Sequence, residues 1–192
     1  CAYGQIVPKV ILDYPNKGCL NVHASLLPKF RGGAPIHWSI IRGETETGVT
    51  LMHMDVGMDS GDMIAKQSVS IEDKDTMGDV EAKLMKASQV LIHEDLKKYL
   101  AGELTSIKQD EAQVTLAYTI KKEDEFISFN RHVKDVYNHI RGLVPWPVGY
   151  GILDEKRVKL HAAEYQHKKV NEPAGTILKV TTEGIEVACI DG

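Results

Sequence analysis

Two polar side chains, Asn21 and His23, lie two residues apart where an apolar run of the sequence gives way to a loop. Side chains of a strand alternate between its two faces, so both groups are predicted to point the same way. Open α/β sheets place their ligand sites at the carboxyl ends of strands. The run NVHASLLPKFRGGAP, which begins at Asn21, therefore predicts a site built from an amide and an imidazole.

A carboxylate, Asp59, stands in a second stretch of this kind, the turn MDSG between two apolar segments. An amide and an imidazole can stabilise a developing oxyanion, and a carboxylate can orient the imidazole or accept a proton through water. No Ser or Cys is placed beside these groups as an activated nucleophile. Asn21, His23 and Asp59 are therefore candidate catalytic residues for an acyl transfer, in which the substrate would supply the attacking nucleophile.

Each of these residues also has a simpler interpretation. A single His at a strand end can be structural, and an Asp in a turn can bond to its own backbone. A metal site from His23, Asp59 and Cys19 is a further alternative, but the positions lack the ligand spacing of a known metal site, so we expect no metal. The residues alone leave these alternatives open.

Composition bounds the class of protein. The 192 residues are 43% hydrophobic and 26% charged with a formal net charge of −4, a globular balance that does not indicate a nucleic-acid binder. No apolar run reaches the roughly 18 to 20 residues that span a bilayer, and the three cysteines form no CxxC pair. We expect a soluble, cytoplasmic monomer without membrane contact. The chain begins without Met, and both ends fall within expected strands or turns, so we expect part of a longer protein.

The first half of the chain alternates strands with helices. The expected strands are 18–23, 48–55 and 63–71, and the expected helices are 8–14, 35–41 and 76–100. Thr76 is the expected N-cap of the last helix, and Gly102 its expected end. This order predicts an α/β domain over residues 1–103 with a mainly parallel sheet.

The second half follows a different pattern. Residues 104–119 are polar and weakly patterned, which is typical of a linker. From residue 120 we expect a short strand at 126–129, a helix at 133–140 and antiparallel strands within 157–165 and 175–190. The simplest interpretation of 120–192 is a small β-barrel that lacks its last strands.

Four motifs resemble those of the methionyl-tRNA formyltransferases. NVHASLLP at 21–28 with RGGAPI at 31–36 resembles the family's catalytic strand and folate loop, and GVTLMHMDVGMDSGD at 48–62 resembles the segment with its catalytic aspartate. NHIRGLVPWP at 138–147 and PAGTI at 173–177 resemble parts of its C-terminal domain. The resemblance implies a partial Rossmann-like formyltransferase domain followed by a truncated OB-like barrel that binds tRNA.

The resemblance also implies a reaction, the transfer of a formyl group from 10-formyltetrahydrofolate to the α-amino group of initiator methionyl-tRNA for translation initiation. Asn21 and His23 would donate hydrogen bonds to the oxyanion formed when the amine attacks. Asp59 would keep His23 in its donating form and help to move the amine proton through water.

Binding residues follow from the same resemblance. The residues carried over for folate are Gln5, Val7, Ser25, Leu26, Leu27, Pro28, Met54, Asp55, Val56, Gly57 and Met58. Core packing is the alternative for the apolar members of this set. Lys29, Arg31 and Arg141 are the candidates for tRNA phosphate, with a solubilising role as the alternative for the two loop residues.

Two other functions remain open from the sequence. Relatives that share the NxH and Asp pattern formylate other amines, so the substrate could be a nucleotide-linked aminosugar. The chain could also be a catalytically silent tRNA-binding module.

Overall fold

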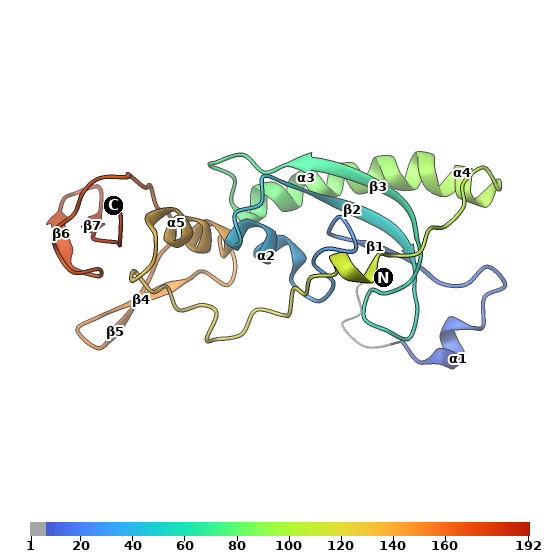
Figure 1. Ribbon diagram of the computed structural model, residues 1–192, viewed down its shortest axis with the longest axis horizontal. Coiled ribbons are helices and arrows are strands. Elements are labelled where there is room, and N and C mark those ends of the chain that lie inside the picture. The colour runs from blue at the N-terminus through green and yellow to red at the C-terminus, as the bar shows by residue number, and fades with distance from the viewer. Residues whose placement is uncertain (1–6) are drawn as a thin grey trace.

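A computed structural model describes residues 7–192, so the predicted folate contact Gln5 lies outside the described residues. Figure 1 shows an elongated molecule with a sheet and a long helical rod at one end and small hairpins at the other. Helix α2 (Pro35–Ile41) packs against helix α5 (Val133–Gly142) where the two halves meet. The described chain therefore forms two packed units in contact.

The sheet of the first unit has three strands, β1 (Leu20–His23), β2 (Glu46–His53) and β3 (Met63–Ser70), in the order β1-β2-β3. Both pairs are antiparallel, so the predicted parallel sheet is wrong for the described residues. Alternation of strands and helices fixes the order of elements but not strand direction. Here the segment that contains α2 returns the chain beside β1 in the opposite sense, and the following turn does the same for β3.

The helices of the first unit follow the sequence closely. Helix α1 spans Lys9–Leu12, and α2 begins at a proline and ends just before Gly43 as expected. The predicted long helix consists of α3 (Met77–Val90), a π-helical segment η1 (Leu91–Leu96) and α4 (Lys97–Leu100). Thr76 caps it through a reciprocal capping box with Asp79. Within residues 7–192 no helix has the length and apolar character that a membrane crossing needs.

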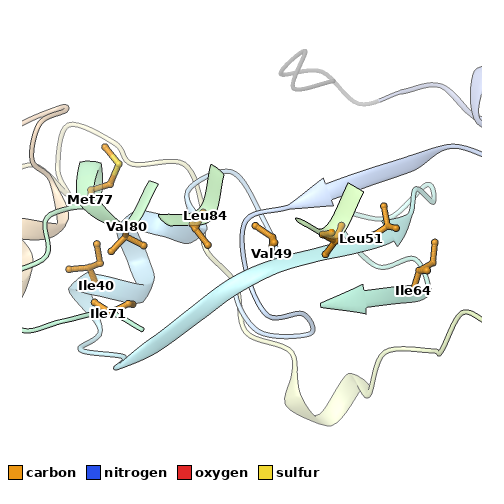
Figure 2. Close-up of a cluster of buried hydrophobic side chains, with 9 residues drawn as sticks. Ile40, Val49, Leu51, Ile64, Ile71, Met77, Val80 and Leu84 are labelled. Carbon is orange, nitrogen blue, oxygen red and sulfur yellow. The ribbon is translucent and has the colours of Figure 1, made fainter. Parts of the chain in front are cut away.

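The core of the first unit lies between β2 and helix α3. Figure 2 shows its buried side chains along the length of β2, including Val49 and Leu51 of that strand with Val80 and Leu84 of α3. Ile40 of α2 belongs to this core, whereas Ile41 belongs to the core of the second unit. Consecutive residues of one helix thus contribute to two cores, and this arrangement ties the units together.

The predicted linker, residues 104–119, is ordered against the first unit. Ile107 exchanges two backbone hydrogen bonds with Met63, at 2.7 and 2.8 Å. The segment then makes a short 3-10 helix, η2 (Glu111–Gln113), and pairs with the chain near Arg31 through Leu116. Its polar sequence reflects an extended path over the surface of the first unit.

The second unit contains α5 and two separate two-stranded sheets. These are β4 (Tyr150–Leu153) with β5 (Lys156–Lys159), and β6 (Ile177–Val180) with β7 (Ile185–Val187), both antiparallel. The expected strand at 126–129 is reduced to one bridge between Phe126 and Tyr150. The hairpin within 175–190 is confirmed, but the OB-like barrel is not.

Candidate active site

Strand β1 carries Asn21 and His23 at the predicted edge of the sheet. Their partners on β2 are Met52 for Asn21 and Thr50 for His23. The His23 side chain is buried, with 6% of the residue exposed, and Asn21 is half-buried at the margin of a small cavity. Along the same face of β1, the His23 side chain thus lies in the interior and the Asn21 side chain lies beside the cavity.

Both ring nitrogens of His23 face oxygen atoms. Nε2 lies 2.9 Å from the carbonyl oxygen of Phe30, and Nδ1 lies 3.6 Å from Oδ1 of Asp59. A carbonyl oxygen can only accept, so Nε2 carries the hydrogen of the first bond. The distance of 3.6 Å between Nδ1 and Oδ1 is longer than a hydrogen bond. A small approach of the two groups would let them share a proton.

The Asp59 side chain is held by a second contact on its other oxygen. The backbone N–H of Gly32 donates to Oδ2 at 2.8 Å. Asp59 has φ of 50°, a left-handed conformation that Asp tolerates better than most residues. Nearby, a Cβ built on Gly61 would lie 2.0 Å from the carbonyl oxygen of His53, so only glycine allows this turn to approach β2 so closely.

A small cavity joins Asn21 to Asp59. Its volume is about 50 Å³, and the described residues that line it are Asn21, Met52, Met54, Asp55, Gly57 and Asp59. His23 is not one of them, although it faces the same carboxylate. The structure thus brings the three predicted catalytic residues together, with Asp59 between the cavity and the imidazole.

The residues predicted to contact folate fall into two groups. Ser25, Leu27 and Pro28 are buried, and Val7, Leu26 and Met54 are half-buried. The turn from Asp55 to Met58 is exposed. Of these residues, Met54, Asp55 and Gly57 line the small cavity beside Asn21 and Asp59, and folate contact by the others stays a prediction.

The loop that contains Ser25 and Leu27 is bonded to the sheet. The buried Thr50 hydroxyl accepts from the Leu27 N–H at 3.1 Å and donates to the Ser25 carbonyl at 2.6 Å. Lys66 donates to the Leu27 carbonyl at 2.5 Å, and burial lowers the pKa of this lysine. These backbone groups are already satisfied by the protein, so a ligand finds more free backbone in the turn from Asp55 to Met58.

The three predicted phosphate contacts differ in exposure. Lys29 is exposed, as a phosphate contact must be. Arg31 and Arg141 are only 6% and 7% exposed, and their guanidinium groups bond to protein atoms. A charge that is buried and bonded in this way is not presented to a polyanion, so the geometry favours a structural role for both arginines, and their contact with phosphate stays an untested prediction.

Sequence reasoning missed three groups that shape the site. They are the Thr50 hydroxyl, the Phe30 carbonyl and the side chain of Gln109, which contacts the backbone of the Asp59 turn. Thr50 lies directly opposite His23 in the strand pair, and its residue type gives no chemical signal of its own. Gln109 lies 50 positions from Asp59 in a stretch that looks like a linker, so no local pattern could reveal it.

Metal ligands do not cluster in the part of the chain that is described. Over residues 7–192, no group of three or more His, Cys, Asp or Glu side chains could hold a metal ion.

Comparison with known proteins gives a consistent picture. Residues 1–96 match the formyl transferase family, and residues 119–192 match the formyl transferase C-terminal domain. A methionyl-tRNA formyltransferase of Staphylococcus aureus is 46% identical over 191 residues, which are 99% of this chain and 61% of that protein. A methionyl-tRNA formyltransferase of Bacillus licheniformis is 48% identical over 188 residues, which are 97% of this chain and 59% of that protein. The chain thus spans about three fifths of these relatives.

Solved structures resemble the fold. An N-formyltransferase from Helicobacter canadensis, in complex with folinic acid and dTDP-3-aminofucose, has a TM-score of 0.75 at 21% identity, covering 90% of this chain and 63% of that one. A 4-N formyltransferase from Francisella tularensis has a TM-score of 0.72 at 25% identity, covering 84% and 67%.

Proposed function

Because the chain belongs to the formyl transferase family, we propose that its site transfers a formyl group from 10-formyltetrahydrofolate to the α-amino group of initiator methionyl-tRNA. Relatives that bear the name methionyl-tRNA formyltransferase support this substrate at 46% and 48% identity over nearly all of the chain. The product would serve translation initiation.

One observation carries the chemistry: the Asp59 carboxylate is fixed between a cavity and an imidazole. Oδ2 is held by the Gly32 N–H at 2.8 Å, which leaves Oδ1 to face His23 Nδ1 at 3.6 Å. Asn21 shares the cavity with Asp59 and supplies an amide N–H group for an oxygen bound there. An amide donor and a proton acceptor therefore meet at one small volume.

The residues present fit a folate-derived donor at its reacting end. A cavity of about 50 Å³ is large enough for a formyl group but not for a pterin ring, so the rest of the donor must lie outside it. Val56 and Met58 are 61% and 49% exposed on the open side and offer apolar surface for such a ring. When bound, 10-formyltetrahydrofolate supplies an activated formyl group for attack by an amine.

The protein groups divide the work of this transfer. Asn21 donates a hydrogen bond to the formyl oxygen as negative charge develops there. Asp59 Oδ1 would take the proton that the amine loses, directly or through water, and His23 Nδ1 faces this oxygen to share it. The same proton can then pass to the donor's N10 as the bond between that nitrogen and the formyl carbon breaks, which releases tetrahydrofolate. His23 Nε2 is bonded to the Phe30 carbonyl, so it reaches a substrate oxygen only if that bond is exchanged. The geometry thus supports Asn21 as the first oxyanion donor and His23 as the partner of Asp59.

A nucleotide-linked aminosugar is the second candidate substrate. The structural relative from Helicobacter canadensis was solved with such a sugar, but at 21% identity it supports the fold alone. The identity of 46% to 48% with tRNA formyltransferases favours tRNA.

The test offers labelled formyl donor to the natural full-length protein with either charged initiator tRNA or a dTDP-linked aminosugar. We expect label in methionyl-tRNA and none in the sugar. Label in the sugar alone would establish the second candidate, and tRNA binding without any transfer would identify a silent binding module.

A further inference from the structure

Gln109 connects the segment after the first unit to the turn that carries Asp59. Its amide nitrogen donates to the carbonyl oxygens of Asp59, at 2.7 Å, and Gly61, at 2.8 Å. Only 9% of the residue is exposed. Two hydrogen bonds from one buried amide therefore fix the backbone on both sides of Ser60.

The amide oxygen of Gln109 is bonded as well. Arg31 Nε donates to it at 2.9 Å, and the other guanidinium nitrogens of Arg31 donate to the Glu111 carboxylate at 2.7 and 3.3 Å. Gln109 thus uses both amide hydrogens and its oxygen, which leaves its side chain one orientation. Gln109 and Arg31 are the buried part of this network, and because their hydrogen-bonding groups are paired, we expect this part to be rigid.

The same segment bonds the loop on the opposite side of Asp59. Thr115 accepts from the N–H groups of Phe30, through Oγ1, and Arg31, through its carbonyl, both at 2.9 Å. Phe30 supplies the oxygen that faces His23, and Gly32 supplies the N–H on Asp59. One segment, 107–117, therefore holds the surroundings of both groups in place.

We infer that Gln109 is a positioning residue for formyl transfer, which sets the distance between the Asp59 carboxylate and the His23 ring. The inference rests on the proposed function. The gap between Oδ1 and Nδ1 is 3.6 Å, so a small displacement of the turn decides whether the two atoms share a proton. Misplacement by about 1 Å costs on the order of 100-fold in rate.

Two variants remove the donors in different ways. Gln109→Glu keeps the size and the oxygen that Arg31 contacts, but sets a carboxylate oxygen against two carbonyl oxygens. Gln109→Met removes the hydrogen bonds without adding charge. Gln113→Glu is the matched control, since Gln113 is exposed in the same segment and its amide bonds only to Asp110.

The kinetic readout separates positioning from folding. We expect kcat to fall about 10-fold to 100-fold in both Gln109 variants, while binding of a folate analogue changes less than about threefold. The control should match the natural protein. In Gln109→Glu, kcat relative to the natural protein should rise as pH falls, because a protonated Glu can donate to one carbonyl again. The same ratio should not change with pH in Gln109→Met.

Hydrogen exchange gives a readout that needs no turnover. The Gly32 amide hydrogen, bonded to Asp59, should exchange faster in both Gln109 variants than in Gln113→Glu. If the natural protein transfers no formyl group, the proposed function fails, and the exchange rates still report on Asp59. The inference is overturned if the Gln109 variants match the control in kcat and exchange. An equal loss of analogue binding or of folded protein would also overturn it, because Gln109 would then serve the fold alone.

Discussion

Two buried arginines, Arg31 and Arg141, look alike in the sequence and do different work in the structure. Arg31 bonds to Gln109, which in turn contacts the backbone of the Asp59 turn, and its charge is paired with Glu111. Arg141 bonds to the Asn138 side chain and to the carbonyl oxygens of Glu72 and Asp75, with no carboxylate in ion-pair distance among the described residues. One arginine belongs to the site, and the other joins the two units.

The difference shows how the surroundings assign a role to a charge. Burial lowers the pKa of the Arg141 guanidinium, and the nearby carboxylates of Asp73 and Asp75 oppose this shift. The hydrogen bonds that hold the buried charge go to the carbonyl oxygens of Glu72 and Asp75. Arg31 reaches the edge of the site through neighbours that lie almost eighty positions away along the chain. Loss of Arg141 should therefore affect stability, and loss of Arg31 should affect rate.

The largest loss of stability is expected for Arg141→Met, which leaves three acceptors without their donor. We expect the free energy of unfolding to fall by about 3 kcal/mol. Denaturant unfolding measures this, with Arg157→Met on the exposed strand β5 as the control. The kcat of the folded fraction should stay unchanged, and a fall in kcat without loss of stability would reverse the comparison.

For Arg31→Met we expect the main effect on the rate of transfer and only a small effect on stability. Gln109 loses the donor that orients it, and we expect kcat to fall by roughly 10-fold with a loss of stability of about 1 kcal/mol. Steady-state kinetics beside a thermal melt separate the two quantities. A variant that melts early yet keeps its rate would place Arg31 in the same class as Arg141.

Thr50→Val sharpens the comparison within the site region. The change removes the two hydrogen bonds to the loop at Ser25 and Leu27 from a residue that is fully buried. We expect about 2 kcal/mol of lost stability and weaker binding of a folate analogue. Isothermal titration of the analogue checks this, and unchanged binding would mean that the loop is not part of the folate wall.

Much of the fold was predictable because its signals are local. Pro35, Gly43 and Thr76 mark helix ends through backbone chemistry that depends on a few neighbouring residues, and those elements were found where they were expected. Strand direction depends on how a connection crosses the sheet, and the sequence between His23 and Glu46 does not encode this in any short pattern. The parallel sheet was therefore wrong while the elements were right.

The site was predictable to the same extent. Asn21, His23 and Asp59 could be singled out because strand alternation and a Gly-flanked turn are local features of the sequence. The structure places all three close together. The roles of Gln109, Arg31 and Arg141 depend on contacts over long sequence separations, which residue type alone does not reveal. The domain boundaries and the residue roles at the site remain predictions.

The smallest effect is expected from a lower pH, which should reduce the stability of the junction between the two units, where Arg141 lies. Desolvation lowers the pKa values of His37 and His139, which lie at the junction of the units and in α5. The folded pKa values lie below the ordinary value of about 6.5, so the unfolded chain binds more protons as pH falls through that value and stability falls with it. Hydrogen exchange at pH 5 and pH 7 should show α5 losing protection before β2. Equal loss in both elements would contradict this order.

The central claim is that His23 and Asp59 form the acid–base pair of a formyl transfer. The most direct measurement is single-turnover transfer to methionyl-tRNA by the natural full-length protein and its His23→Ala and Asp59→Asn variants, with Asp62→Asn in the same turn as the control. We expect each of the first two to lose on the order of 100-fold to 1000-fold in rate while still binding tRNA and a folate analogue. Transfer at the natural rate by either variant would falsify the claim.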